Sequence, residues 1–251
     1  MERITSRQNP LVLKIRKLNQ HRKYRRELGL YPCEGPKLLQ EALAAGVAVH
    51  TVAAAQGVSL PTEIGAQGVE VPGELLEHMC DTKTPQGVIF LAEMPDTKPP
   101  EQLTGRCYLV LDGVQDPGNV GTIWRTADAL GADGLILVNG CADPFSPKTV
   151  RATMGACFRL PVYEVRGEEL PQLLNNSQLP LYATALQADT VDLRQVDRQR
   201  CAVVIGSEGR GVSQALLEQS QQTIKIPMRE RCESLNAAVA ATIVLWEICQ
   251  R

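Results

Sequence analysis

The chain has 251 residues, 44% of them hydrophobic, which is enough to bury the core of one large domain or of two modest ones. Its net charge of −2 hides an asymmetry, because the first 30 residues carry nine Lys and Arg against two Glu. This basic end favours a polyanionic partner, although a solvated helix face accounts for the same residues. The polar N-terminus and the interrupted apolar runs exclude a signal core and a membrane span, so we expect a cytoplasmic protein.

The eight cysteines and three histidines show no metal-ligand spacing. No CxxC pair occurs, and several cysteines, such as Cys107 and Cys201, stand in apolar runs. We therefore expect buried, reduced thiols and no metal site.

The N-terminal third alternates helix and strand signals. Residues 9–28 predict one basic amphipathic helix with an apolar stripe formed by Leu11, Ile15 and Leu18. Strands are predicted at 30–35, 47–55 and 87–92, and helices at 36–45 and 71–80. Residues 94–105 hold three prolines and no periodic pattern, which predicts a linker between a domain at 1–93 and another at 106–251.

The second domain carries stronger signals. Short apolar runs at 107–111, 134–138, 161–165, 181–186, 201–205 and 223–226 are typical of parallel strands buried on both faces. Helical patterns lie between or after them, at about 119–131, 147–157, 168–175, 212–220 and 234–249. The alternation predicts an α/β fold with a parallel sheet.

Ligands of open α/β sheets bind beyond the carboxyl ends of the strands, which directs attention to three loops. In 112–134, Asn119 is a candidate helix N-cap, and Arg125 follows at a spacing that lets it project near the loop. Glycines 206, 209 and 211 surround Glu208 in the second loop and give backbone access to a ligand. In the third, Ser234 is a candidate N-cap of a helix rich in small residues. Each loop alone is also compatible with ordinary caps and turns.

Several common site types are absent from these loops. None matches a GxxxxGK[ST] phosphate loop, and no GxGxxG follows the first strand of the second domain. All three histidines lie before residue 80, which excludes a Ser-His-Asp order.

Taken together and in this order, the loops resemble the three motifs of the SpoU family of RNA 2′-O-ribose methyltransferases, in the knotted SPOUT superfamily. The resemblance covers residues 107–250. The matching residues are Asn119, Gly121, Arg125, Ala127 and Gly131 in the first motif, Gly206, Glu208 and Gly211 in the second, and Ile226-Pro227-Met228 with Ser234-Leu235-Asn236 in the third. More loosely, the N-terminal part is similar to the substrate-binding domain of many members, through ITSRQNP, YRRELGLYPCEG and TKTPQGV.

The resemblance implies a C-terminal parallel-sheet domain with a deep trefoil knot and a smaller N-terminal α/β domain that binds RNA. It also implies a homodimer with the C-terminal helix in its interface, and S-adenosylmethionine as cofactor. By the same resemblance, the cofactor-binding residues are Gly206, Ser207, Gly211, Ile226, Met228, Ser234 and Leu235, and the catalytic ones are Arg125, Asn119, Glu208, Ser234 and Asn236.

Methyl transfer to a ribose hydroxyl requires alignment of the reacting atoms and removal of a proton from a weak acid. Because an arginine stays protonated in proteins, we expect Arg125 to fix an RNA phosphate and polarise the 2′-oxygen rather than act as a base. Asn119, Ser234 and Asn236 would orient Arg125 and the ribose. Glu208 would either take part in proton removal or anchor its loop.

Three alternatives stay open. Transfer RNA is a second substrate class, but its methyltransferases in this family often lack an N-terminal domain of this size, which favours large-subunit ribosomal RNA. The chain could instead be an RNA-binding module without catalysis, although Asn119, Arg125, Ser234 and Asn236 are all present. The third alternative is a nucleotide-binding α/β protein of unrelated function.

Overall fold

The computed structural model describes residues 2–61, 64, 67–187, 189–196, 199–229 and 234–249. By contacts the chain divides into two compact units. Unit 1 contains Met1–Asp96 together with Phe145–Phe158, and unit 2 contains Thr97–Pro144 and Arg159–Arg251. Unit 1 is therefore built from two separate stretches of sequence.

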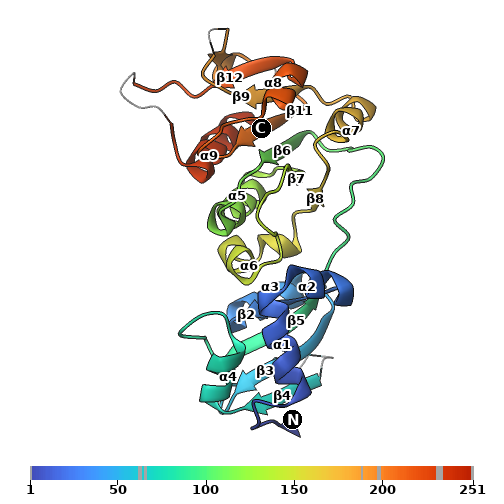
Figure 1. Cartoon of the computed structure of the whole chain (residues 1–251), viewed down its shortest axis with the longest axis vertical. Coiled ribbons are helices and arrows are strands. Elements are labelled where there is room, and N and C mark those ends of the chain that lie inside the picture. Colours follow the sequence, from blue (N-terminus) through green and yellow to red (C-terminus); the bar gives the residue numbers. More distant parts are fainter. Residues whose placement is uncertain are drawn as a thin grey trace. The chain divides into compact units, whose positions relative to one another are not determined.

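Unit 1 is a mixed five-stranded sheet with helices, and Figure 1 labels most of its elements. Its sheet order is β1-β4-β3-β5-β2, in which β5 runs antiparallel to both β2 and β3. The elements are β1 (Glu2–Arg3), α1 (Pro10–Gln20), α2 (Arg22–Leu28), β2 (Leu30–Glu34), α3 (Pro36–Ala44), β3 (Val49–Ala55), β4 (Gln67–Val71), α4 (Gly73–Met79) and β5 (Val88–Glu93), with α6 (Pro147–Thr153) and η1 (Ala156–Phe158) from the second stretch. Strand β4 covers the start of the predicted helix 71–80, which begins only at Gly73.

The predicted helix 9–28 is two helices that meet at His21, whose φ of −120° is extended. Asn9 caps α1, and its side chain accepts a hydrogen bond from the Leu11 backbone. At the junction the Arg25 side chain is buried and donates to the carbonyl oxygens of Leu18 and Asn19. One of the nine N-terminal cations thus satisfies carbonyls at the end of a helix instead of facing solvent.

Unit 2 is an α/β fold with a seven-stranded sheet in the order β10-β12-β9-β11-β6-β7-β8. All six strand pairings in it are parallel, as the buried apolar runs predict. The elements are β6 (Cys107–Asp112), α5 (Pro117–Leu130), β7 (Gly134–Val138), β8 (Val162–Glu164), α7 (Leu170–Asn176), β9 (Leu181–Thr184), β10 (Val191–Asp192), η2 (Leu193–Gln195), β11 (Cys201–Gly206), α8 (Gln214–Gln219), β12 (Gln222–Lys225) and α9 (Ala237–Ile248). The expected fold class is confirmed.

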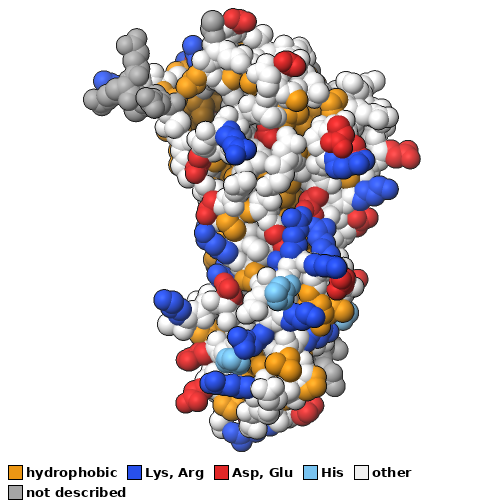
Figure 2. All heavy atoms as spheres, in the orientation of Figure 1, with side chains coloured by type: hydrophobic (Ala, Val, Ile, Leu, Met, Phe, Trp, Pro, Cys, Tyr) orange, Lys and Arg blue, Asp and Glu red, His pale blue; other side chains and the backbone are white. Residues whose placement is uncertain are grey.

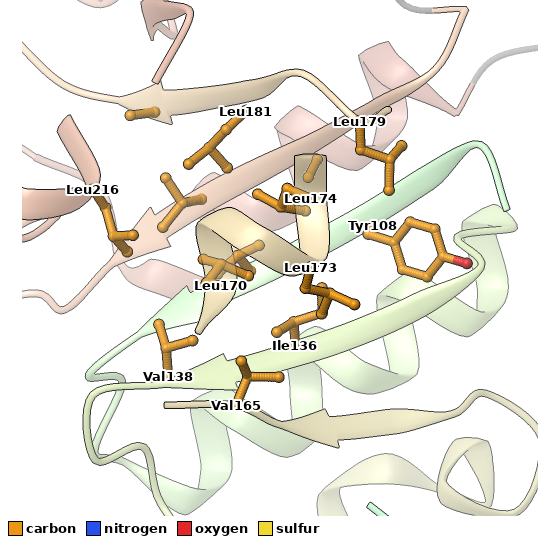
Figure 3. Packing of buried hydrophobic residues seen from close by; sticks show 14 of the residues in the cluster. Tyr108, Ile136, Val138, Val165, Leu170, Leu173, Leu174, Leu179, Leu181 and Leu216 are labelled. Carbon is orange, nitrogen blue, oxygen red and sulfur yellow. The ribbon is translucent and has the colours of Figure 1, made fainter. Parts of the chain in front are cut away.

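The unit 2 sheet is covered on both faces. Leu170, Leu173 and Leu174 of α7 lie over one face, as Figure 3 shows, where they pack with Ile136 and Val138 of β7 in one buried cluster. On the other face, α9 packs against α5 and β11. Because alternate residues of a strand point to opposite faces, burial on both sides explains why these strands are apolar throughout.

The proline-rich segment 94–105 is not a free linker over most of its length. Leu103 is buried, and its backbone N–H donates to Ser177 Oγ at 2.8 Å. The Arg200 guanidinium donates to the carbonyl oxygens of Leu103 and Gly105. Residues 97–105 therefore pack as part of unit 2, held by side chains that lie far along the chain.

The described cysteines are free thiols, and Cys33, Cys107, Cys157 and Cys201 are buried. Cys232 lies outside the described residues. Within the described ranges, no helix is long and apolar enough to cross a membrane, and no cluster of His, Cys, Asp or Glu is suited to hold a metal ion.

Candidate active site

The carboxyl ends of three adjacent strands, β12, β9 and β11, enclose a cavity of about 340 Å³ in unit 2. All seven residues predicted to bind the cofactor line it: Gly206, Ser207, Gly211, Ile226, Met228, Ser234 and Leu235. Glu208 lines it as well. Most of the other lining side chains are apolar or small, so the cavity offers hydrophobic contact and backbone polar groups.

The second loop folds back on itself behind this cavity. The Gly211 backbone N–H donates to the Ser207 carbonyl at 2.8 Å, and Gly211 has a φ of 67°. A Cβ atom on Gly206 would lie 2.0 Å from the carbonyl carbon of Gly211, so only glycine permits this closure. The glycines therefore set the shape of the cavity wall.

A buried carboxylate fixes the far end of the same loop. Asp112, at the end of β6, accepts hydrogen bonds from the Ser213 backbone at 2.6 Å and from Asn139 Nδ2 at 2.7 Å. Only 4% of Asp112 is exposed. Because a buried carboxylate needs such partners, this contact ties the second loop to the ends of β6 and β7.

The three motifs meet at Glu208. Its Oε1 atom accepts hydrogen bonds from Asn119 Nδ2 at 2.8 Å, from Asn236 Nδ2 at 2.6 Å and from the Ala237 backbone at 3.3 Å. Asn236 Nδ2 also lies 3.2 Å from Asn119 Oδ1. Three of the five predicted catalytic residues thus form one network at the edge of the cavity, and Ser234 lines the cavity beside it.

Both predicted helix caps are wrong. Asp116 caps α5, accepting from the Asn119 backbone at 2.9 Å, because Pro117 suits the first helical position and starts the helix earlier. Asn236, not Ser234, caps α9 and accepts from the backbone of Ala238 and Val239. Asn119 is therefore free to use its side chain for the network, and Asn236 serves as both cap and network member.

Arg125 stands apart from the other predicted catalytic residues. Its side chain is exposed on α5 and makes no hydrogen bond or ion pair with any described residue. Six positions along a helix separate it from Asn119, which turns the two side chains about 120° apart. Within one chain the structure does not bring Arg125 to the network or the cavity.

The sequence interpretation missed the part of the cavity wall formed by Thr184, Ala185 and Leu186. Thr184 ends β9, which lies between β11 and β12 in the sheet, and Ala185 and Leu186 follow it. The strand was predicted at 181–186, and the carboxyl-end rule applied to it would have found them. Ala237 and Ala240 of α9, also in the wall, carried no comparable signal.

Comparison with known proteins identifies the family. Residues 106–246 match the SpoU rRNA Methylase family, and residues 9–90 match the MRM3-like substrate binding domain. An uncharacterized tRNA/rRNA methyltransferase of Synechocystis is 39% identical over 97% of this chain and 92% of its own length. The 23S rRNA (guanosine(2553)-2'-O)-methyltransferase RlmP of Bacillus subtilis is 33% identical over 99% of each chain.

A solved structure agrees over the full length. The AdoMet-bound rRNA methyltransferase from Sinorhizobium meliloti has a TM-score of 0.88 at 33% identity, covering 98% of this chain and 97% of that one. The resemblance inferred from the three motifs is confirmed: the chain belongs to the SpoU rRNA methylase family.

Proposed function

We propose that this chain transfers a methyl group from S-adenosylmethionine to a ribose 2′-hydroxyl of large-subunit ribosomal RNA, and does so in the cytoplasm. The observation that carries the proposal is the network joining Asn119, Glu208 and Asn236 at the edge of a cavity lined by glycines and apolar side chains. The ribosomal assignment is supported by the full-length similarity to a 23S rRNA methyltransferase and by the match of residues 9–90 to a substrate binding domain.

The cavity residues fit S-adenosylmethionine. Leu186, Ile226 and Leu235 offer apolar surface for a purine, and the backbone around Gly206 offers polar groups to the rest of the molecule. Glu208 supplies negative charge toward a cofactor that carries positive charge on sulfur and on its amine. When bound, the cofactor supplies an electrophilic methyl group.

Glu208 is best explained as a positioning residue, since its Oε1 atom already accepts three N–H donors. We propose that it holds the Asn119 and Asn236 amides so that they orient the ribose beside the cofactor. Arg125, which is exposed and has no described partner, is available to bind an RNA phosphate and polarise the 2′-oxygen. A fixed positive charge near the oxygen favours loss of its proton.

The exposed face of α9 supports a homodimer. Val239, Ile243 and Trp246 are 47%, 37% and 60% exposed, and their spacing places them on one side of the helix. An apolar stripe of this kind on a folded surface is typical of an interface. We propose that α9 of one copy packs against a second copy of the chain through this stripe.

A trefoil knot in unit 2 is part of the same proposal. It is supported by the order of the C-terminal elements: α9 follows β12, which lies next to the edge strand β10, yet α9 packs against α5 and β11. Tracing the chain through 226–236 in an experimental structure tests the knot. A chain that runs past the loop before β11 without threading through it would contradict the knot.

Unit 1 carries the proposed RNA-binding surface, formed by the exposed cations Arg7, Lys17, Arg22, Lys23 and Arg26. Figure 2 shows Lys and Arg side chains gathered on the face of unit 1 that carries α1 and α2. Such a surface supplies phosphate contacts that are independent of sequence. We propose sequence bounds of 1–93 for this RNA-binding domain and 106–251 for the methyltransferase domain, supported by the family matches at 9–90 and 106–246. The segment 94–105 connects the two in sequence, although its residues 97–105 pack in unit 2.

Methyl incorporation tests the proposed function directly. The purified chain is incubated with labelled S-adenosylmethionine and either large-subunit ribosomal RNA or bulk transfer RNA, and 2′-O-methyl positions are mapped. We expect one modified ribose in the ribosomal RNA only. Incorporation confined to transfer RNA would make transfer RNA the substrate class in place of ribosomal RNA. Failure to bind S-adenosylmethionine in calorimetry would exclude methyltransferase activity.

A further inference from the structure

Unit 1 contains a second cavity, of about 270 Å³, away from the α1–α2 surface residues. Its wall includes Lys37 and Leu38 of α3, Thr84 and Gln86 of the loop before β5, and Arg151 and Met154 at the end of α6. Three separate segments of unit 1 therefore converge on it, and the mechanism of methyl transfer uses none of them.

The polar part of the wall is fixed before any ligand arrives. Only 5% of the Glu34 side chain is exposed, and its two oxygens accept from the Asp81 backbone at 2.6 Å and from Thr82 Oγ1 at 2.5 Å. Arg151 Nη2 pairs with Asp81 Oδ2 at 2.8 Å. These contacts hold a carboxylate and a guanidinium together in a fixed arrangement.

The Arg151 side chain is 30% exposed and lines the cavity. Its Nη1 atom is buried, makes no hydrogen bond to a described residue and forms an ion pair with Glu34 Oε1 at 3.7 Å. A ligand in the cavity therefore meets the exposed part of the Arg151 side chain and not the buried Nη1 atom.

The rim adds apolar surface. Met154 is 45% exposed and has a φ of 50°, a conformation that few residues other than glycine adopt. Leu38 provides apolar surface on the α3 side. The cavity thus combines a planar cation with apolar walls, which are groups on which a flat heterocycle stacks.

The charge and the volume of the cavity limit which ligands it can hold. The wall carries Lys37 and Arg151 against Glu34 and Glu41, so its formal charge cancels, which is unsuited to a free polyphosphate. The volume is smaller than that of most sites for whole cofactors. A neutral planar base fits both limits, while the exposed cations of α1 and α2 are left to bind phosphates.

We propose that this cavity takes the base of one unpaired nucleotide of the RNA substrate and so contributes to the choice of site. The inference rests on the proposed function, because it requires that RNA is the substrate. RNA-binding proteins read sequence mainly by inserting unstacked bases into such pockets, whereas phosphate contacts set affinity.

Ultraviolet crosslinking of the full chain to large-subunit ribosomal RNA, followed by mass spectrometry, locates the base. We expect a nucleotide joined to residues 35–41, 82–86 or 151–154. Crosslinks confined to other segments would overturn the proposal. Methylation by the wild-type chain is measured on the same RNA. If the RNA is methylated but no base is crosslinked to the cavity, this inference alone is refuted. If the chain neither binds nor methylates the RNA, the proposed function is refuted.

A double-mutant cycle then tests the contact. Thr84→Tyr places a ring at the cavity wall, and Lys83→Tyr is the matched change at an exposed neighbour that does not line the cavity. Removing the crosslinked base from the RNA is expected to weaken wild-type binding about tenfold, and the Lys83→Tyr variant equally. For Thr84→Tyr the loss should fall below about twofold.

The kinetic readout separates this role from a general loss of fold. Thr84→Tyr should raise KM for RNA about tenfold with kcat and cofactor affinity unchanged. Arg151→Lys keeps the charge beside Asp81 but removes the guanidinium plane, and should show the same pattern. An equal penalty for base removal in wild type and in both variants would overturn the proposal.

Discussion

Asn119 and Asn236, which lie 117 positions apart in the chain, donate hydrogen bonds to the same atom, Oε1 of Glu208. One carboxylate oxygen therefore holds the start of α5 and the start of α9 together at the cavity edge. The first prediction follows from this shared acceptor.

Glu208→Gln should lower the rate of methyl transfer at least tenfold. A glutamine side chain has only one accepting oxygen and carries an amide where the second oxygen stood, so the two asparagines lose a charged acceptor. Hydrogen bonds to a charged group contribute about 1.5–3 kcal/mol each, and about 1.4 kcal/mol corresponds to a tenfold rate. Single-turnover rates with saturating cofactor and RNA measure the effect, and a rate within twofold of wild type would remove Glu208 from the positioning role.

Gly206→Ala should abolish cofactor binding, because its Cβ would lie 2.0 Å from the Gly211 backbone and force the loop open. Gly209 provides the matched control in the same loop. A Cβ there meets nothing within 4 Å, so Gly209→Ala should bind S-adenosylmethionine within about twofold of wild type. Isothermal titration calorimetry compares the two, and equal affinities would show that the closure of the loop is irrelevant to the cofactor.

Arg125→Ala should abolish methylation while leaving cofactor affinity unchanged. The side chain is exposed and has no described partner, so the free energy of unfolding should change by less than about 0.5 kcal/mol. Arg125→Lys should recover little activity, because an ammonium cannot bind a phosphate with two parallel N–H groups. Turnover near the wild-type rate in the alanine variant would refute the role given to Arg125.

Trp246→Glu should convert the proposed dimer to a monomer, because it places a charge in the apolar stripe of α9. Leu13→Glu is the control, since Leu13 is also an exposed apolar side chain, at 45% against 60% for Trp246, but lies on α1. Sedimentation equilibrium reports the mass of each. A wild-type monomer, or a dimer that survives the α9 substitution, would contradict the proposed interface.

Replacing Arg22, Lys23 and Arg26 by glutamine should weaken RNA binding and lower the slope of log Kd against log salt by up to about three units. Each cation that contacts a phosphate contributes about one unit to that slope. The control replaces Lys98, Arg166 and Arg194, three exposed cations of unit 2, and should leave the slope unchanged. Binding curves at several salt concentrations give the slope for each triple variant. Equal slopes in the two variants would show that the α1–α2 cations do not form the RNA-binding surface.

The sequence predicts the unit 2 sheet well because strands buried on both faces need apolar residues at every position. It does not reveal β1 or β10, which have two residues each and are too short for a periodic signal. Strand β4 is missed because Gln67–Val71 mixes polar and apolar residues. Its last residue, Val71, was assigned to the start of the predicted helix 71–80.

The site was predictable as a set of motifs but not as a geometry. The order of the motifs identifies Asn119, Glu208 and Asn236, yet their hydrogen bonds join residues 89 and 28 positions apart, which no local pattern encodes. The helix caps were assigned incorrectly because Asp116 and Asn236 are as suitable for capping as the residues chosen. Local preference cannot choose between neighbouring good caps.

The division of unit 1 between two stretches of sequence has a consequence for synthesis. The ring of Tyr31 packs against that of Phe145 with centroids 4.9 Å apart, and Glu34 lies beside Arg151. The nascent chain emerges from the ribosome with its N-terminus first, so β6, α5 and β7 emerge before the second stretch of unit 1. When β7 has emerged, neither unit is therefore complete, and unit 1 can finish folding only after residues 145–158 have been synthesised.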